Sequence, residues 1–119
     1  MTEIKLKRAY EPSSPDDGFR IYVDRLWPQG LSHETFHYDL WEKQISPSTE
    51  LREWFHVDRE GRWDEFARKY LAELKASEAF KSFCDIVKQH RVVTLLFSSK
   101  DTEHNNAVIV KEALQQSLV

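Results

Sequence analysis

A group of polar side chains follows the most apolar stretch of the chain, Val92–Phe97. After two serines, this group contains Lys100, Asp101, His104, Asn105 and Asn106. Lysine brings a full positive charge for an anion, and the backbone N–H groups at the start of a helix also attract one. Histidine can exchange a proton near neutral pH. We therefore predict that Lys100, Asn105 and Asn106 bind an anionic ligand, and that Asp101 and His104 serve any proton transfer.

A simpler interpretation is that these residues only begin a helix. Apolar residues recur at helical spacing from Ala107 onward, and they predict a helix that starts near Thr102 or Glu103. Asp101 or Thr102 would cap this helix while the other polar side chains remain solvated. A helix cap requires only one such residue. Capping alone therefore does not explain the lysine, the histidine and the two asparagines.

A second group, Asp24, Arg25 and Trp27, follows residues 19–23 (FRIYV), which are mostly apolar. Arg25 could hold a substrate, with Asp24 as a base or an orienting group. The alternative is a structural ion pair that anchors the loop. We expect Trp27 mainly to pack against other apolar side chains, with a wall of the cleft as its second role.

The elements that position these groups follow from apolar patterning. The unbroken apolar run Val92–Phe97 is typical of a strand buried on both faces. Alternating residues 4–10 predict a second strand nearer a sheet edge, and residues 19–23 predict a third. A long helical connection between residues 23 and 92 favours parallel crossovers. We predict an α/β domain with a small, mainly parallel sheet of three or more strands and helices packed on it.

Several helices are expected between those strands. Apolar residues at helical spacing predict helices over residues 63–74 and 80–87, the second capped by Ser77. Ser46 before Pro47 is typical of a helix start. A short helix from Ser32 is also plausible.

The carboxyl ends of parallel strands meet at one edge of a sheet, and ligands bind there. Arg8 and Tyr10 end the first strand. We therefore expect Arg8 and Tyr10 to join Asp24, Arg25, Trp27 and the group after residue 97 in one ligand-binding cleft.

Composition limits the function further. The 119 residues suffice for one domain with a single core, and we assign residues 1–119 to it. A net charge of −3 makes nucleic acid an unlikely partner, since nucleic-acid binding needs a basic face. No stretch approaches the ~20 apolar residues of a membrane span, and the N-terminus lacks a signal-peptide core. We expect a soluble, cytoplasmic protein without a membrane partner, of unspecified oligomeric state.

Two other features of the sequence contain reactive side chains. Residues 33–37 read HETFH and match the zinc-protease pattern H-E-x-x-H. Their segment lacks a long apolar helical stripe, and a third ligand is not evident, so we expect no metal and no cofactor; a zinc metallohydrolase is only a remote alternative. The single cysteine, Cys84, lies on an apolar helix face, and we expect a core residue rather than a nucleophile.

Four segments of the chain form a distinctive set: residues 14–18 (SPDDG), 20–30 around VDRLWP, 47–55 (PSTELREWF) and 100–107 (KDTEHNNA). With these segments, nearly the whole chain resembles the YeaO-like family, small bacterial proteins of unknown function. The resemblance implies a bacterial cytosolic α/β protein and supplies no activity. The chain departs from the family pattern at Gln29 and at residues 56–59 (HVDR).

Two functions are compatible with these observations. The first is the binding or processing of an anionic small molecule such as a phosphate ester or nucleotide. The second is a non-enzymatic regulatory or interaction module, because some family members carry a transcription-regulator label. The sequence contains no helix-turn-helix pattern and no basic recognition helix. A pocket at the sheet edge would favour the first function, and a flat surface the second.

Overall fold

The computed structural model describes residues 1–118, and its centre is a four-stranded sheet in which every paired strand is parallel. The strands are β1 (Glu3–Arg8), β2 (Phe19–Tyr22), β3 (Leu40–Trp41) and β4 (Val92–Phe97). Their spatial order is β1-β4-β2-β3. The predicted α/β class with a mainly parallel sheet is therefore confirmed.

Strand β4 lies between β1 and β2, as the unbroken apolar run predicts. Its residues from Val93 to Phe97 are buried. Leu95 packs into the core beneath the helices, and Leu96 packs into a second apolar cluster on the opposite face. Both faces of this strand are covered, which is why its sequence does not alternate with polar residues.

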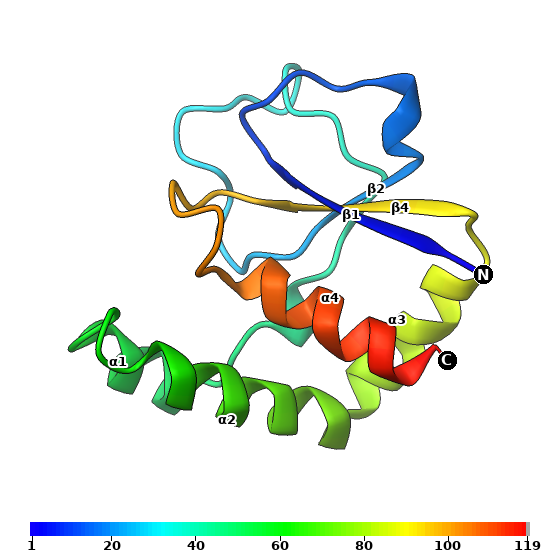
Figure 1. Cartoon of the computed structure of the whole chain (residues 1–119). Helices are drawn as coiled ribbons and strands as arrows, with labels where there is room; N and C mark the ends of the chain where they lie inside the picture. The colour runs from blue at the N-terminus through cyan, green and yellow to red at the C-terminus, as the bar shows by residue number, and fades with distance from the viewer. Residues whose placement is uncertain (119) are drawn as a thin grey trace.

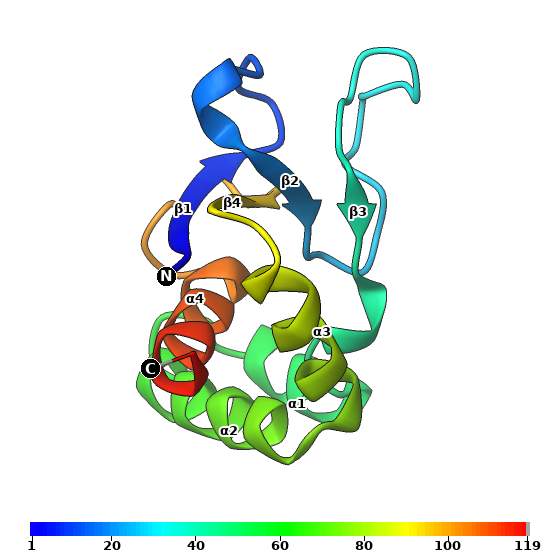
Figure 2. The ribbon, with the colours of Figure 1, turned by 90° about the vertical axis from the view of Figure 1, so that its right-hand side faces the viewer.

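All four helices lie on one side of the sheet (Figures 1 and 2). They are α1 (Thr49–His56), α2 (Trp63–Ala76), α3 (Glu78–Lys88) and α4 (Asn106–Ser117). Their apolar faces form the main core with alternate residues of the strands, such as Ile21 of β2 and Val93 and Leu95 of β4. Cys84 belongs to this core, as predicted.

Loops and one short 3-10 turn, without an α-helix among the described residues, lie on the other side of the sheet (Figure 1). Ala9, Tyr22, Phe36 and Leu96 form a buried cluster there, and Trp27, Leu31, Tyr38 and Trp41 pack against it. The rings of Trp27 and Trp41 meet nearly edge to face at 5.5 Å. This aromatic packing fixes the loop that follows β2, and so fixes the residues at the carboxyl end of the sheet.

A buried ion pair joins the loop after β1 to the sheet. Asp17 contacts Arg20, and both side chains are less than one tenth exposed. Burial acts to raise the pKa of Asp17, but hydrogen bonds from the Ser14 amide, Lys7 and Arg20 outweigh it and lower the pKa. The Thr94 hydroxyl donates to the Asp17 carbonyl at 2.7 Å, which ties this turn to the central strand.

Two helix starts and one expected helix differ from the predictions. Helix α4 begins at Asn106, with Asn105 as its cap, because Asp101 is used in a turn before it. Ser48 rather than Ser46 caps α1, so Pro47 precedes the cap. The segment from Ser32 forms a turn and no helix, so its two histidines do not share a helix face.

Two further elements are 3-10 turns at Pro15–Asp17 and Lys43–Ile45. Within residues 1–118, no helix combines the length and apolar character that crossing a membrane requires.

Candidate functional site

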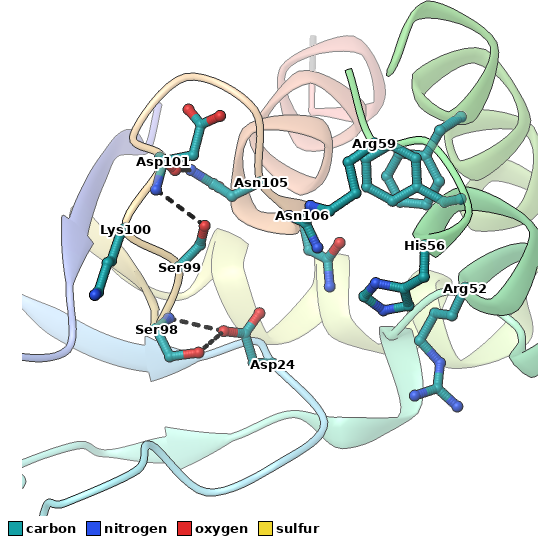
Figure 3. Close-up of a pocket in the computed structure, with 12 residues that line it drawn as sticks. Asp24, Arg52, His56, Arg59, Ser98, Ser99, Lys100, Asp101, Asn105 and Asn106 are labelled. Carbon is teal, nitrogen blue, oxygen red and sulfur yellow. Dashed lines mark hydrogen bonds between the residues drawn. The ribbon is translucent and has the colours of Figure 1, made fainter. Parts of the chain in front are cut away.

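A pocket of about 540 Å³ opens where β4 ends, and three segments of the chain surround it (Figure 3). We call it the Asp24 pocket. The loop after β2 contributes Asp24, and the β4–α4 connection and the region of α1 contribute most of the rest. Its lining is Asp24, Arg52, Phe55, His56, Arg59, Phe66, Ser98, Ser99, Lys100, Asp101, Asn105 and Asn106. A pocket thus lies at the carboxyl edge of the sheet, and Asp24, Lys100 and Asp101 are among its lining residues.

Asp24 is fixed against the end of β4. Its Oδ2 accepts hydrogen bonds from the Ser98 amide at 2.8 Å and from the Ser98 hydroxyl at 2.9 Å. The Asp24 carbonyl accepts a hydrogen bond from Trp41 Nε1 at 2.7 Å. Burial raises the pKa of Asp24, and the Ser98 hydrogen bonds offset only part of this rise. The carboxyl group is thus easier to protonate than an ordinary aspartate.

Asp101 and Asn105 organise the start of α4. Asp101 Oδ1 accepts the amides of Glu103 and His104, each at 2.9 Å, and these bonds lower the pKa of Asp101. Asn105 Oδ1 accepts the Val108 amide at 3.1 Å, and Asn105 Nδ2 donates to the Asp101 carbonyl at 2.8 Å. These contacts hold the first turn of α4 at the pocket, where its N–H groups favour an anion.

The basic side chains on the facing wall come from α1 and the turn after it: Arg52, His56 and Arg59. The Arg59 guanidinium lies 5.1 Å from the centre of the Phe55 ring. Within residues 1–118, the buried Nε of Arg52 has no hydrogen-bond partner. Sequence reasoning missed this wall. Arg52 and His56 are four residues apart, so a helix places them on one face, and that spacing was the available signal.

Two of the predicted residues are positioned elsewhere. Arg25 is exposed on the loop after β2, outside the pocket linings found in the described part of the chain. His104 is exposed, and its ring stacks on Trp63 with the ring centres 4.6 Å apart. The Arg25 and His104 side chains therefore do not join Asp24 in the lining of its pocket.

The remaining predicted residues form a second pocket beside the first. We call it the Tyr10 pocket; its volume is about 940 Å³ and its lining is Arg8, Tyr10, Leu26, Trp27, Gln29, Gly30, Ser98 and Lys100. Ser98 and Lys100 line both pockets. Two adjoining pockets thus lie at the carboxyl edge of the sheet. Their linings come partly from the end of β1, the loop after β2 and the β4–α4 connection.

Comparison with known proteins adds a family and no activity. Residues 3–119 match the family model described as "Inactive DUF488-N3 subclade". The uncharacterised protein YeaO of Escherichia coli K12 is 43% identical over 116 residues, which cover 94% of this chain and 96% of YeaO. The uncharacterised protein Rv3073c of Mycobacterium tuberculosis is 36% identical over 113 residues, covering 95% of this chain and 94% of the relative. No solved structure gives a significant match.

Proposed function

This chain belongs to the family described as the inactive DUF488-N3 subclade, and we propose that it binds an anionic small molecule such as a phosphate ester in the Asp24 pocket without transforming it. The observation that carries this proposal is the charge on the pocket wall. Arg52 and Arg59 are cationic, His56 lies on the same wall, and Lys100 stands at the edge of the pocket. They enclose a concave space, whose volume falls within the range of small-molecule sites.

The two acidic side chains of the pocket do not cancel this positive wall. Asp101 is held by two backbone amides of its own turn, so its charge is largely satisfied locally. The raised pKa of Asp24 makes its charge the easier one to lose.

Binding without turnover is supported by the positions of the groups that could transfer protons. His104 stacks on Trp63 outside the pocket lining, and Asp101 caps its own turn. The description of the family as inactive points the same way. In this proposal Asp24, Asp101 and His104 have structural or electrostatic roles, and no cofactor is required.

Isothermal titration calorimetry with inorganic phosphate and pyrophosphate tests the proposal. Arg59→Ala should weaken binding by roughly 10- to 100-fold, the value of a hydrogen bond to a charged group. The matched control is Arg68→Ala, because Arg68 is exposed on α2 and lies outside the pocket lining. Equal effects of the two substitutions, or no binding by the unmodified protein, would contradict the proposal and favour an interaction module. Hydrolysis of a phosphate ester that Arg59→Ala abolishes would contradict the absence of turnover.

A further inference from the structure

The Tyr10 pocket has the composition of a platform for a planar ring. Leu26 is 73% exposed and Tyr10 is 38% exposed, so apolar side chains face solvent there, with Trp27 beside them. Arg8 and Lys100 are its charged residues, and no carboxylate contributes to the lining formed by the described residues. Aromatic and basic side chains together are the combination that binds nucleobases next to phosphates.

The aromatic surface is held in place before any ligand arrives. The Arg8 guanidinium lies 4.9 Å from the centre of the Tyr10 ring and donates to the carbonyls of Ser98 and Ser99. The Tyr10 hydroxyl donates to the Gln29 carbonyl at 2.7 Å. Because Arg8 is engaged by two carbonyl groups and one ring, it serves mainly to fix Tyr10 rather than to receive a second anion. A preorganised surface loses less entropy on binding.

The two pockets can accept one molecule because they share Ser98 and Lys100. Figure 3 shows the Lys100 side chain directed away from His56 and Arg52. Lys100 therefore stands at the boundary between the basic wall of the Asp24 pocket and the aromatic surface of the Tyr10 pocket. An anion in the first pocket and a ring in the second would lie on either side of this residue.

We infer that the ligand is a nucleotide-like phosphate ester, with its phosphate in the Asp24 pocket and its planar ring in the Tyr10 pocket; this inference rests on the proposed function. The Gln29 side-chain amide can donate and accept hydrogen bonds at the edge of such a ring. Gly30 leaves room for it, because a Cβ added there would have no neighbouring atom within 4 Å. The departure from the family pattern at Gln29 thus lies where ring selectivity would be set.

Calorimetry with ribose 5-phosphate and with the four ribonucleoside monophosphates tests this inference on the full-length chain. At least one nucleotide should bind about tenfold more tightly than ribose 5-phosphate, because stacking of the base adds to the phosphate contacts. Leu26→Ser and Tyr10→Ala should each reduce this advantage, because each should weaken nucleotide binding more than ribose 5-phosphate binding. Tyr10→Phe keeps the ring and should retain most of the advantage. Arg59→Ala should weaken both kinds of ligand.

The possible failures are distinct. If the nucleotides and ribose 5-phosphate bind equally, or if Leu26→Ser and Tyr10→Ala weaken ribose 5-phosphate as much as the nucleotides, the ring site is refuted while anion binding stands. If neither ribose 5-phosphate nor inorganic phosphate binds, the proposed function fails and this inference fails with it. Circular dichroism of each variant establishes that the fold is retained.

Discussion

Replacement of Asp24 by asparagine should strengthen anion binding. The asparagine carbonyl oxygen can take over the hydrogen bonds that Asp24 Oδ2 accepts from the amide and hydroxyl of Ser98, at 2.8 and 2.9 Å. The substitution therefore removes a negative charge from the pocket and retains the anchor at the end of β4. Most substitutions in a binding site weaken binding, so a gain of affinity would be specific to this electrostatic argument.

The expected size follows from Coulomb's law. Two unit charges ~8 Å apart in an effective dielectric of ~20 repel by roughly 2 kcal/mol, or thirtyfold in Kd. Dissolved salt screens this repulsion and makes it smaller. We therefore expect Asp24→Asn to bind a divalent anion roughly 5- to 30-fold more tightly at pH 8.

The affinity for an anion should depend on pH, because the charge of Asp24 does. Burial raises the pKa of Asp24 despite the hydrogen bonds from Ser98, so the neutral form persists above the ordinary range of an aspartate. Anion affinity of the unmodified protein should rise as pH falls through this pKa, and Asp24→Asn should lack that rise. The free energy of unfolding should depend on pH in the same direction. Protonated Asp24 stabilises the fold at low pH, and this stabilisation is lost as pH rises through the pKa of Asp24 in the folded protein.

Sulfate is the suitable probe, because it keeps its charge from about pH 4.5 to 8. Calorimetry should be done in a His56→Gln background, which removes the imidazole from the pocket wall. Two other groups near Asp24 do not mimic its titration: backbone hydrogen bonds from His104 and Glu103 lower the pKa of Asp101, and burial raises the pKa of Tyr22. Unchanged or weaker sulfate binding by Asp24→Asn would refute the reasoning.

Three predictions concern stability, measured by urea unfolding. Asp17→Asn should cost about 3 kcal/mol because it leaves buried Arg20 unpaired. Burial acts to raise the pKa of Asp17, but hydrogen bonds that include those from Lys7 and Arg20 lower it. The stability lost in Asp17→Asn should therefore shrink as pH falls through the pKa of Asp17 in the folded protein. A loss of stability that is the same at every pH would contradict this prediction. Gly18→Ala should cost about 2 kcal/mol or more, because φ is 64° and a Cβ would lie 2.3 Å from the Val92 carbonyl oxygen; a neutral result would exclude that clash. Cys84→Ala should cost about 1 kcal/mol and keep anion binding, and rapid thiol labelling of the folded protein would count against its core position.

The sheet was predictable from sequence because its central strand is buried on both faces, and that burial leaves an unbroken apolar run at Val92–Phe97. Strand β3 was not predictable, because Leu40 and Trp41 are too few to form a pattern. The start of α4 was predicted several residues early. Asp101 and Asn105 are both suitable caps, and only the tertiary position of the loop determines that Asn105 caps the helix.

The candidate site was predictable on one side only. Parallel strands bring their carboxyl ends to one edge, which placed Asp24 and Lys100 together without any knowledge of contacts. The opposite wall comes from α1, whose packing against the sheet edge depends on the whole core. Arg25 follows Asp24 directly, but the chain turns there and leaves it exposed, and adjacency in sequence cannot reveal that direction.

Nuclear magnetic resonance titration with inorganic phosphate tests the proposed anion site most directly. The backbone amides that should shift are those of the β4–α4 connection and of α1, with Ser99, Asn106 and His56 among the largest changes. Arg59→Ala should remove these shifts at the same phosphate concentration, and Arg68→Ala should retain them. Shifts that are absent, or that gather around exposed lysines such as Lys75 and Lys88 instead, would contradict an anion site at the carboxyl edge of the sheet.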